Sequence, residues 1–96
     1  MSRLEAGLEV GIPCDVRPGA FSDEYLVTIE SLSGPVSGFV GRATVFGVED
    51  DSGYLKAIVQ EVTNDTVTVW IRGSFFTTTG LADLSYEWAR SNLQTV

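Results

Sequence analysis

The chain has 96 residues, 44% of them apolar, and its 13 acidic side chains against six Lys and Arg give a net charge of −7. This length supports a single folded domain, residues 1–96, with one hydrophobic core. The negative charge disfavours duplex nucleic acid and anionic membrane surfaces, which proteins bind mainly through Lys and Arg. No apolar run approaches the roughly 20 residues of a membrane span, and the first residues lack the apolar stretch of a signal peptide, so a cytoplasmic protein is expected.

The sequence contains no histidine and a single cysteine. Histidine is the commonest general base, the commonest zinc ligand and the usual partner of a serine or cysteine nucleophile. Cys14 alternates with apolar neighbours, which indicates a small buried side chain rather than a reactive or metal-bound thiol. The acidic cluster at 49–53 does not match the ligand spacing of a calcium loop, and it predicts a solvated turn. We therefore expect no enzymatic activity, no metal and no cofactor.

Three segments in the first half of the chain have the patterns of strands. Apolar residues fall at every second position of 9–16, the period of a half-buried strand. Pro13 lies inside this run and cannot donate a backbone N–H, so it indicates an edge position or an interruption of the ladder. A second strand is predicted at 25–31. The chain returns through 36–48, where three glycines and a change in the apolar phase indicate a bulge.

Residues 54–72 predict a β-hairpin folded about the Asn-Asp pair at 64–65, which tolerates the positive φ of a two-residue turn. With this register Ile58 lies on the core face, and Val59 forms a cross-strand pair with Trp70 on the outer face. A fully solvated sheet does not need such an apolar pair. We therefore expect a neighbouring segment, a second subunit or a ligand to cover it.

Beyond the hairpin, apolar residues recur at helical spacing, and Ser85 or Asp83 can cap the first turn. A short helix is predicted at 85–93, with Trp88 and Leu93 packed onto the sheet, and residues 1–8 form a lead-in. Five strands, tight connections and one short helix favour a small antiparallel barrel. An SH3-like barrel is the first expectation, with an OB-like barrel or a β-sandwich as the alternatives.

The candidate binding residues are mainly aromatic. Two phenylalanine-bearing loops follow strands, and near one barrel rim they would form an aromatic groove that docks extended or Pro-rich peptides. The alternative is that these side chains plug the barrel ends, because a small domain needs its large side chains for burial. With the outer-face valine included, the candidates are Phe21, Tyr54, Val59, Trp70, Phe75 and Phe76.

The segment at 34–40, Gly-Pro-Val-Ser-Gly-Phe-Val, resembles a strand common in bacterial SH3-like small β-barrel domains. The order of strands and loops over residues 9–73 is also similar to theirs. The resemblance implies an SH3-like fold but carries over no functional residue, and the expected C-terminal helix with Trp88 departs from it. The chain is also similar to the small acidic proteins encoded in bacterial mobile gene cassettes.

The leading hypothesis is a non-enzymatic protein-interaction or self-association module. Its aromatic anchors would be buried against the partner, while the surrounding carboxylates steer basic partners towards it. A homodimer through the Val59–Trp70 face is one form of this hypothesis. The alternative is a protein that binds an apolar or cationic small molecule. Single-stranded nucleic-acid binding is a third hypothesis, which would need a basic groove beside the aromatics. A closed aromatic pocket would favour the small molecule, and an open face would favour a protein partner.

Overall fold

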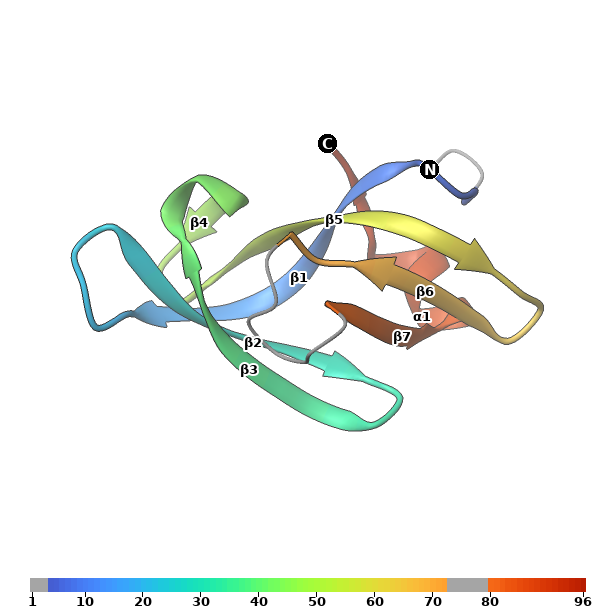
Figure 1. Cartoon of the computed structure of the whole chain (residues 1–96), viewed down its shortest axis with the longest axis horizontal. Helices are drawn as coiled ribbons and strands as arrows, with labels where there is room; N and C mark the ends of the chain where they lie inside the picture. The colour runs from blue at the N-terminus through green and yellow to red at the C-terminus, as the bar shows by residue number, and fades with distance from the viewer. Residues whose placement is uncertain (1–3, 73–79) are drawn as a thin grey trace.

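The computed structural model describes residues 4–72 and 80–96, which form a curled antiparallel sheet with one short helix (Figure 1). The expected mainly-β class is confirmed, but the described residues form eight strands rather than five. In chain order the elements are β1 (Glu9–Pro18), β2 (Glu24–Ser31), β3 (Gly34–Gly41), the 3₁₀ turn η1 (Arg42–Thr44), β4 (Val45–Glu49), β5 (Ser52–Val62), β6 (Thr66–Trp70), β7 (Leu81–Ser85), α1 (Tyr86–Asn92) and β8 (Gln94–Thr95).

Strand β1 organises the sheet, whose order is β3-β2-β1-β5-β6-β7. On one side β1 pairs with β5 over most of its length, and on the other it pairs first with β8 and then with β2. Pro13 lies between the stretch paired with β8 and the stretch paired with β2. The predicted interruption at this proline is therefore confirmed, at a position where a residue without an N–H is tolerated.

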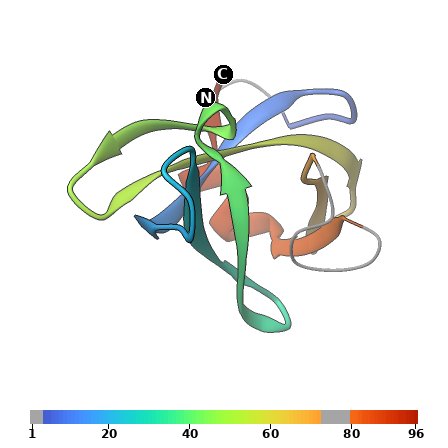
Figure 2. The same cartoon turned by 60° about the vertical axis from the view of Figure 1, so that its left-hand side comes forward.

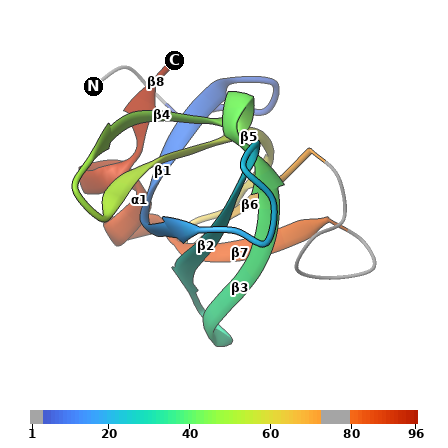
Figure 3. The same ribbon diagram turned by 90° about the vertical axis from the view of Figure 1, so that its left-hand side faces the viewer.

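The sheet curls into a half-barrel, so that its two ends approach one another. Strand β7 comes round towards the β2–β3 hairpin, as the view along the long axis shows (Figure 3). The backbone N–H of Leu32, in the turn of that hairpin, donates to the carbonyl oxygen of Asp83 on β7 at 2.9 Å. Figure 2 shows the β2–β3 hairpin extending from the rest of the sheet on the side opposite the two termini.

The core fills the concave side of the sheet, where alternate residues of each strand point inwards. The predicted alternation in β1 is confirmed, because its apolar residues at 10, 12, 14 and 16 are all buried. The helix also contributes Ala89, and Leu93 follows it into the core. Ser85 caps this helix by accepting a hydrogen bond from the backbone N–H of Trp88, as predicted.

The β5–β6 hairpin turns at 64–65 as predicted, with the backbone N–H of Thr63 donating to the carbonyl oxygen of Thr66 at 2.8 Å. The expected positive φ is wrong, however, because neither Asn64 nor Asp65 adopts it. The first two residue pairs beyond the turn also have the predicted register. The ladder then shifts, because Gln60 is an extra residue on β5 with no partner on β6. Such a bulge moves every later side chain of the strand to the opposite face.

The predicted pair between Val59 and Trp70 is therefore wrong. Val59 faces Val69 instead and is buried in the core, with 1% of its side-chain and backbone surface exposed. Ile58, predicted to lie in the core, takes the place opposite Trp70 on the outer face, where both residues are half-buried. The bulge at Gln60 is the physical cause of both corrections.

Two further segments differ from prediction. No bulge interrupts the β2–β3 ladder, and the chain breaks into two strands at the η1 turn. The irregularity expected within 36–48 occurs later, between Phe46 and Glu49 of β4, where Gly47 has a positive φ of 61°. At the C-terminal end, a strand that the sequence did not predict, β7, precedes the helix. The helix itself spans Tyr86–Asn92, close to the predicted 85–93.

Candidate functional site

A cleft of about 290 Å³ lies beside the middle of β5. Strands β4 and β6 both pair with the side of β5 that faces away from β1. The β4 ladder reaches Leu55 and the β6 ladder begins at Ile58, so the cleft opens between the two partner strands. Its lining residues are Glu9, Ala43, Thr44, Lys56, Ala57, Ile58, Trp70 and Arg72.

The apolar wall of the cleft includes Ile58 and Trp70, which belong to a row of side chains that continues across three strands. Trp70 on β6 lies between its cross-strand neighbours, Ile58 on β5 and Leu81 on β7. Leu81 is 40% exposed, and the other two are half-buried. We call these three residues the Trp70 row.

The charged wall of the cleft is formed by Lys56 and Arg72, two of the six cationic side chains of the chain. Neither forms an ion pair within the described residues, where the one ion pair is Arg17 with Asp15 at 3.3 Å. Glu9 supplies a single carboxylate to the same cleft. The cleft therefore carries a net positive charge in a protein of charge −7, and an anionic group would be attracted to it.

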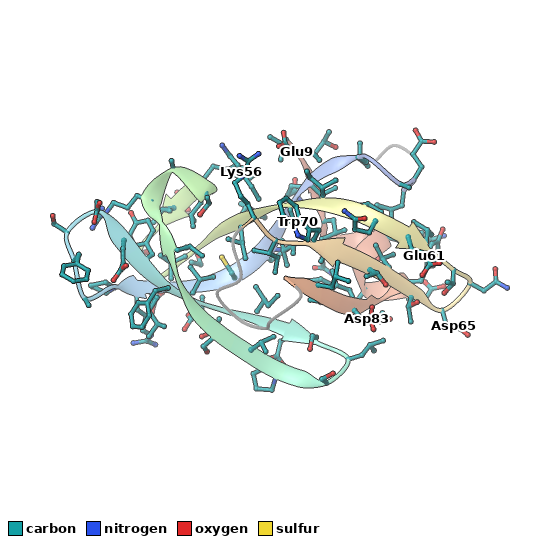
Figure 4. All side chains as sticks on the ribbon, in the orientation of Figure 1. Glu9, Lys56, Glu61, Asp65, Trp70 and Asp83 are labelled. Atoms are coloured by element: carbon teal, nitrogen blue, oxygen red, sulfur yellow. The ribbon has the colours of Figure 1, made fainter. Side chains whose placement is uncertain are left out.

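The remaining predicted site residues do not join this cleft. Tyr54 stacks on Phe46, with ring centroids 5.4 Å apart. The Phe46 ring also lies against Gly11, where an added Cβ would clash with the ring. Phe21 is 71% exposed in the β1–β2 turn at the left-hand end of Figure 1, well away from Trp70, which Figure 4 labels near the centre.

Two other predicted residues, Phe75 and Phe76, lie outside the described residues. Val59 is buried in the core. Of the six aromatic and apolar candidates, the structure thus places Trp70 in the cleft and does not bring Phe21 or Tyr54 into it. Sequence reasoning missed Ile58, Lys56 and Arg72, although Lys56 and Ile58 share a face of β5 through simple alternation.

A second, smaller hollow of about 190 Å³ lies where the β2–β3 turn meets β7 and the helix. It is lined by Glu30, Ser31, Leu32, Leu84, Ser85 and Trp88. Leu32 is tied to β7 through its backbone, and Trp88 packs against the core. We interpret this hollow as the junction that joins the two ends of the curled sheet.

The acidic cluster at 49–53 forms the turn between β4 and β5, as predicted. Asp50 has a φ of 57°, in the left-handed region that tight turns require. The hydroxyl of Ser52 donates to the carbonyl oxygen of Glu49 at 3.2 Å and closes the turn. Across residues 4–72 and 80–96, no three acidic or cysteine side chains come together as a metal site.

Cys14 should react slowly with alkylating agents in the folded protein. Burial, together with the neighbouring Asp15 carboxylate, raises the pKa of its thiol from 9.0 to about 11. The reactive thiolate is then about 100-fold scarcer at mildly alkaline pH than in an unperturbed thiol. Iodoacetamide labelling followed by mass spectrometry measures the rate, and the chain unfolded in urea is the control. Equal rates in the folded and unfolded chains would contradict the prediction.

No protein-family model, curated protein sequence or solved structure matches this chain significantly. Helices capable of crossing a membrane are absent from the described part of the chain.

Proposed function

We propose that this protein is a non-enzymatic protein-interaction module that binds its partner at the cleft lined by Trp70, Lys56 and Arg72. The observation that supports it is the half-buried Trp70 beside two cations without an ion pair among the described residues. Tryptophan and arginine are the residues most enriched among those that dominate binding energy at protein interfaces. The absence of histidine and the protonated state of Cys14 support a function in binding rather than in catalysis.

The open position of the cleft favours a protein partner over a small molecule. Its volume of about 290 Å³ lies at the lower end of the range of about 300–1,000 Å³ for small-molecule sites, but the cleft opens at the surface of the sheet. One or two anchoring side chains of a partner would fill such a volume. Should the ligand be a small molecule, the two cations favour an anionic one over the cationic ligand expected from the sequence.

Replacing Trp70 with alanine should strongly weaken binding to peptides selected on this protein. A random-peptide display library would be selected on the immobilised protein, and the enriched peptides would be measured by fluorescence anisotropy. We expect the dissociation constant to rise by at least about 30-fold, the effect of losing a dominant interface residue. Phe39→Ala, at an exposed aromatic residue on β3, is the matched control and should change little. Peptides that bind wild type and Trp70→Ala equally would overturn the proposed function.

The proposal also includes the cellular location, the type of barrel and the bacterial origin expected from the sequence. A cytoplasmic location is supported by the free Cys14, which suits a reducing compartment. An SH3-like barrel is supported by the curled antiparallel sheet and its β1–β2–β3 meander. A bacterial origin, similar to that of the cassette proteins, is supported by the small size and acidic composition.

A further inference from the structure

The outer face of β5, β6 and β7 carries its charges in a definite order. Figure 4 shows Lys56 and Trp70 near the middle of the molecule, with Glu61, Asp83 and Asp65 towards the right-hand end. The side chains of this face lie in three rows; the strand registers align two of them, and the third consists of the two cations that line the cleft. From one end to the other they are the cations Lys56 and Arg72, then the Trp70 row, then the acidic row of Glu61, Thr68 and Asp83.

The two charged rows lie at equal distances from the Trp70 row. On β5 Lys56 precedes Ile58 by two residues, and on β6 and β7 Thr68 and Asp83 are two residues from Trp70 and Leu81. Arg72 lies just beyond the end of β6 and lines the same cleft as Lys56. Two residues of extended chain span about 7 Å. On β5 the bulge at Gln60 absorbs one residue, so Glu61 still aligns with Thr68. The cationic and acidic rows are thus placed symmetrically about the apolar one.

A hydrogen bond orients one carboxylate of the acidic row, and its acidic side chains can form ion pairs with another molecule. The hydroxyl of Thr68 donates to Oδ1 of Asp83 at 2.6 Å, which orients this carboxylate on the outer face. Glu61 is exposed beside it, and neither acid forms an ion pair within the described residues. Asp65, in the adjoining turn, adds a third exposed carboxylate.

We propose that this face docks onto the same face of a second copy of this chain, about a two-fold axis through the Trp70 row. The rotation places the cations of one copy opposite the acids of the other, twice, and brings the two Trp70 rows together. A surface with an apolar centre and opposite charges at equal distances on either side is complementary to itself under this symmetry. This inference rests on the proposed function and identifies the partner.

The overall charge of −7 on each copy does not prevent this association at physiological ionic strength. The shortest dimension of the protein is 21 Å, so the centres of two docked copies lie at least 21 Å apart. This exceeds the Debye length of about 8 Å, and the repulsion between the net charges is largely screened. Ion pairs across the interface act at a few ångström and are screened much less.

The face spans three strands and three rows, which is smaller than the roughly 800 Å² per partner of a stable interface. We therefore expect a weak dimer in exchange with the monomer. Light scattering coupled to size-exclusion chromatography, up to a concentration of about 1 mM, should show the mass rising from 10.4 kDa towards twice that value. A monomeric mass over the whole range would overturn the inference.

Charge reversal provides the decisive comparison. The variant Lys56→Glu/Arg72→Glu has an acidic face throughout, and Glu61→Lys/Asp83→Lys has a cationic one at both ends. Each variant alone should lose self-association by at least about 30-fold, because like charges then oppose one another. An equimolar mixture of the two should associate again, as a heterodimer. A mixture as monomeric as its components would also overturn the inference.

A matched control has the same change in net charge elsewhere on the surface. Arg17→Glu/Arg90→Glu removes two exposed cations from β1 and the helix, and it should self-associate like the wild type. Thermal unfolding of each variant verifies that it is folded. A monomeric wild type whose selected peptides still require Trp70 would reject the second copy as partner and retain the proposed function. Failure of both experiments would reject both.

Discussion

Val59→Asp should unfold the protein, whereas Ile58→Asp, one residue away, should leave it folded. Val59 is enclosed in the core, and an unpaired charge buried there costs about 3–5 kcal/mol or more, a large part of the roughly 5–15 kcal/mol that stabilises a domain. Ile58 is half-buried on the outer face, where an aspartate can reach water. Urea unfolding followed by circular dichroism gives the free energy of unfolding of each variant.

This pair of variants tests the bulge directly. Without an extra residue at Gln60, the register of the hairpin would place Ile58 in the core and Val59 outside, so the order of the two stabilities would be reversed. A folded Val59→Asp together with an unfolded Ile58→Asp would therefore show that the shift in the β5–β6 ladder is incorrect. Ile58→Asp should additionally weaken binding at the cleft, because it removes one member of the Trp70 row.

Leu55→Ala should lower the free energy of unfolding by about 2–5 kcal/mol, the usual cost of emptying a buried leucine site. Leu55 is fully buried on β5 between its partners on β1 and β4, Ile12 and Val45. Leu32→Ala is the matched control, since this leucine is 56% exposed and its backbone hydrogen bond survives the substitution. Urea unfolding should show a change of less than about 1 kcal/mol for the control. Equal losses would contradict the position of Leu55 in the core.

Local patterns predicted much of the fold. Alternation found the core face of β1, and the Asn-Asp pair at 64–65 located the hairpin turn. Pro13 correctly marked an interrupted ladder, and Ser85 was among the predicted caps of the helix. These features depend on a few neighbouring residues and on backbone preferences, which the sequence records directly.

Features that depend on distant packing were not predictable. Gln60 has no property that marks it as an unpaired residue, since a bulge in a long hairpin is decided by which side chains fit the core. Residues 81–85 have an apolar spacing compatible with a helix, yet they form β7 because the free edge of β6 is available for pairing. In both cases the packing of the folded protein, rather than the local sequence pattern, decides the structure.

The candidate site also combines residues that the sequence predicted with residues that only the folded structure brings together. Trp70 was predicted because a large aromatic residue opposite an aliphatic one on an outer face needs a cover. The predicted aliphatic neighbour of Trp70, Val59, was wrong, because the bulge at Gln60 places Ile58 opposite Trp70 instead. The cations Lys56 and Arg72 come from different strands, and the gap between β4 and β6 that joins them exists only in the folded sheet.

The pairing of β1 has a consequence for the order in which the protein folds. The β2–β3 and β5–β6 hairpins join residues close in sequence, whereas Glu9 pairs with Ile58, about 50 residues away, and Val10 with Thr95, about 85 residues away. Closing such long loops costs chain entropy before any contact compensates for it. We expect the two hairpins to form early and the docking of β1 between them to limit the rate, with folding in milliseconds to seconds.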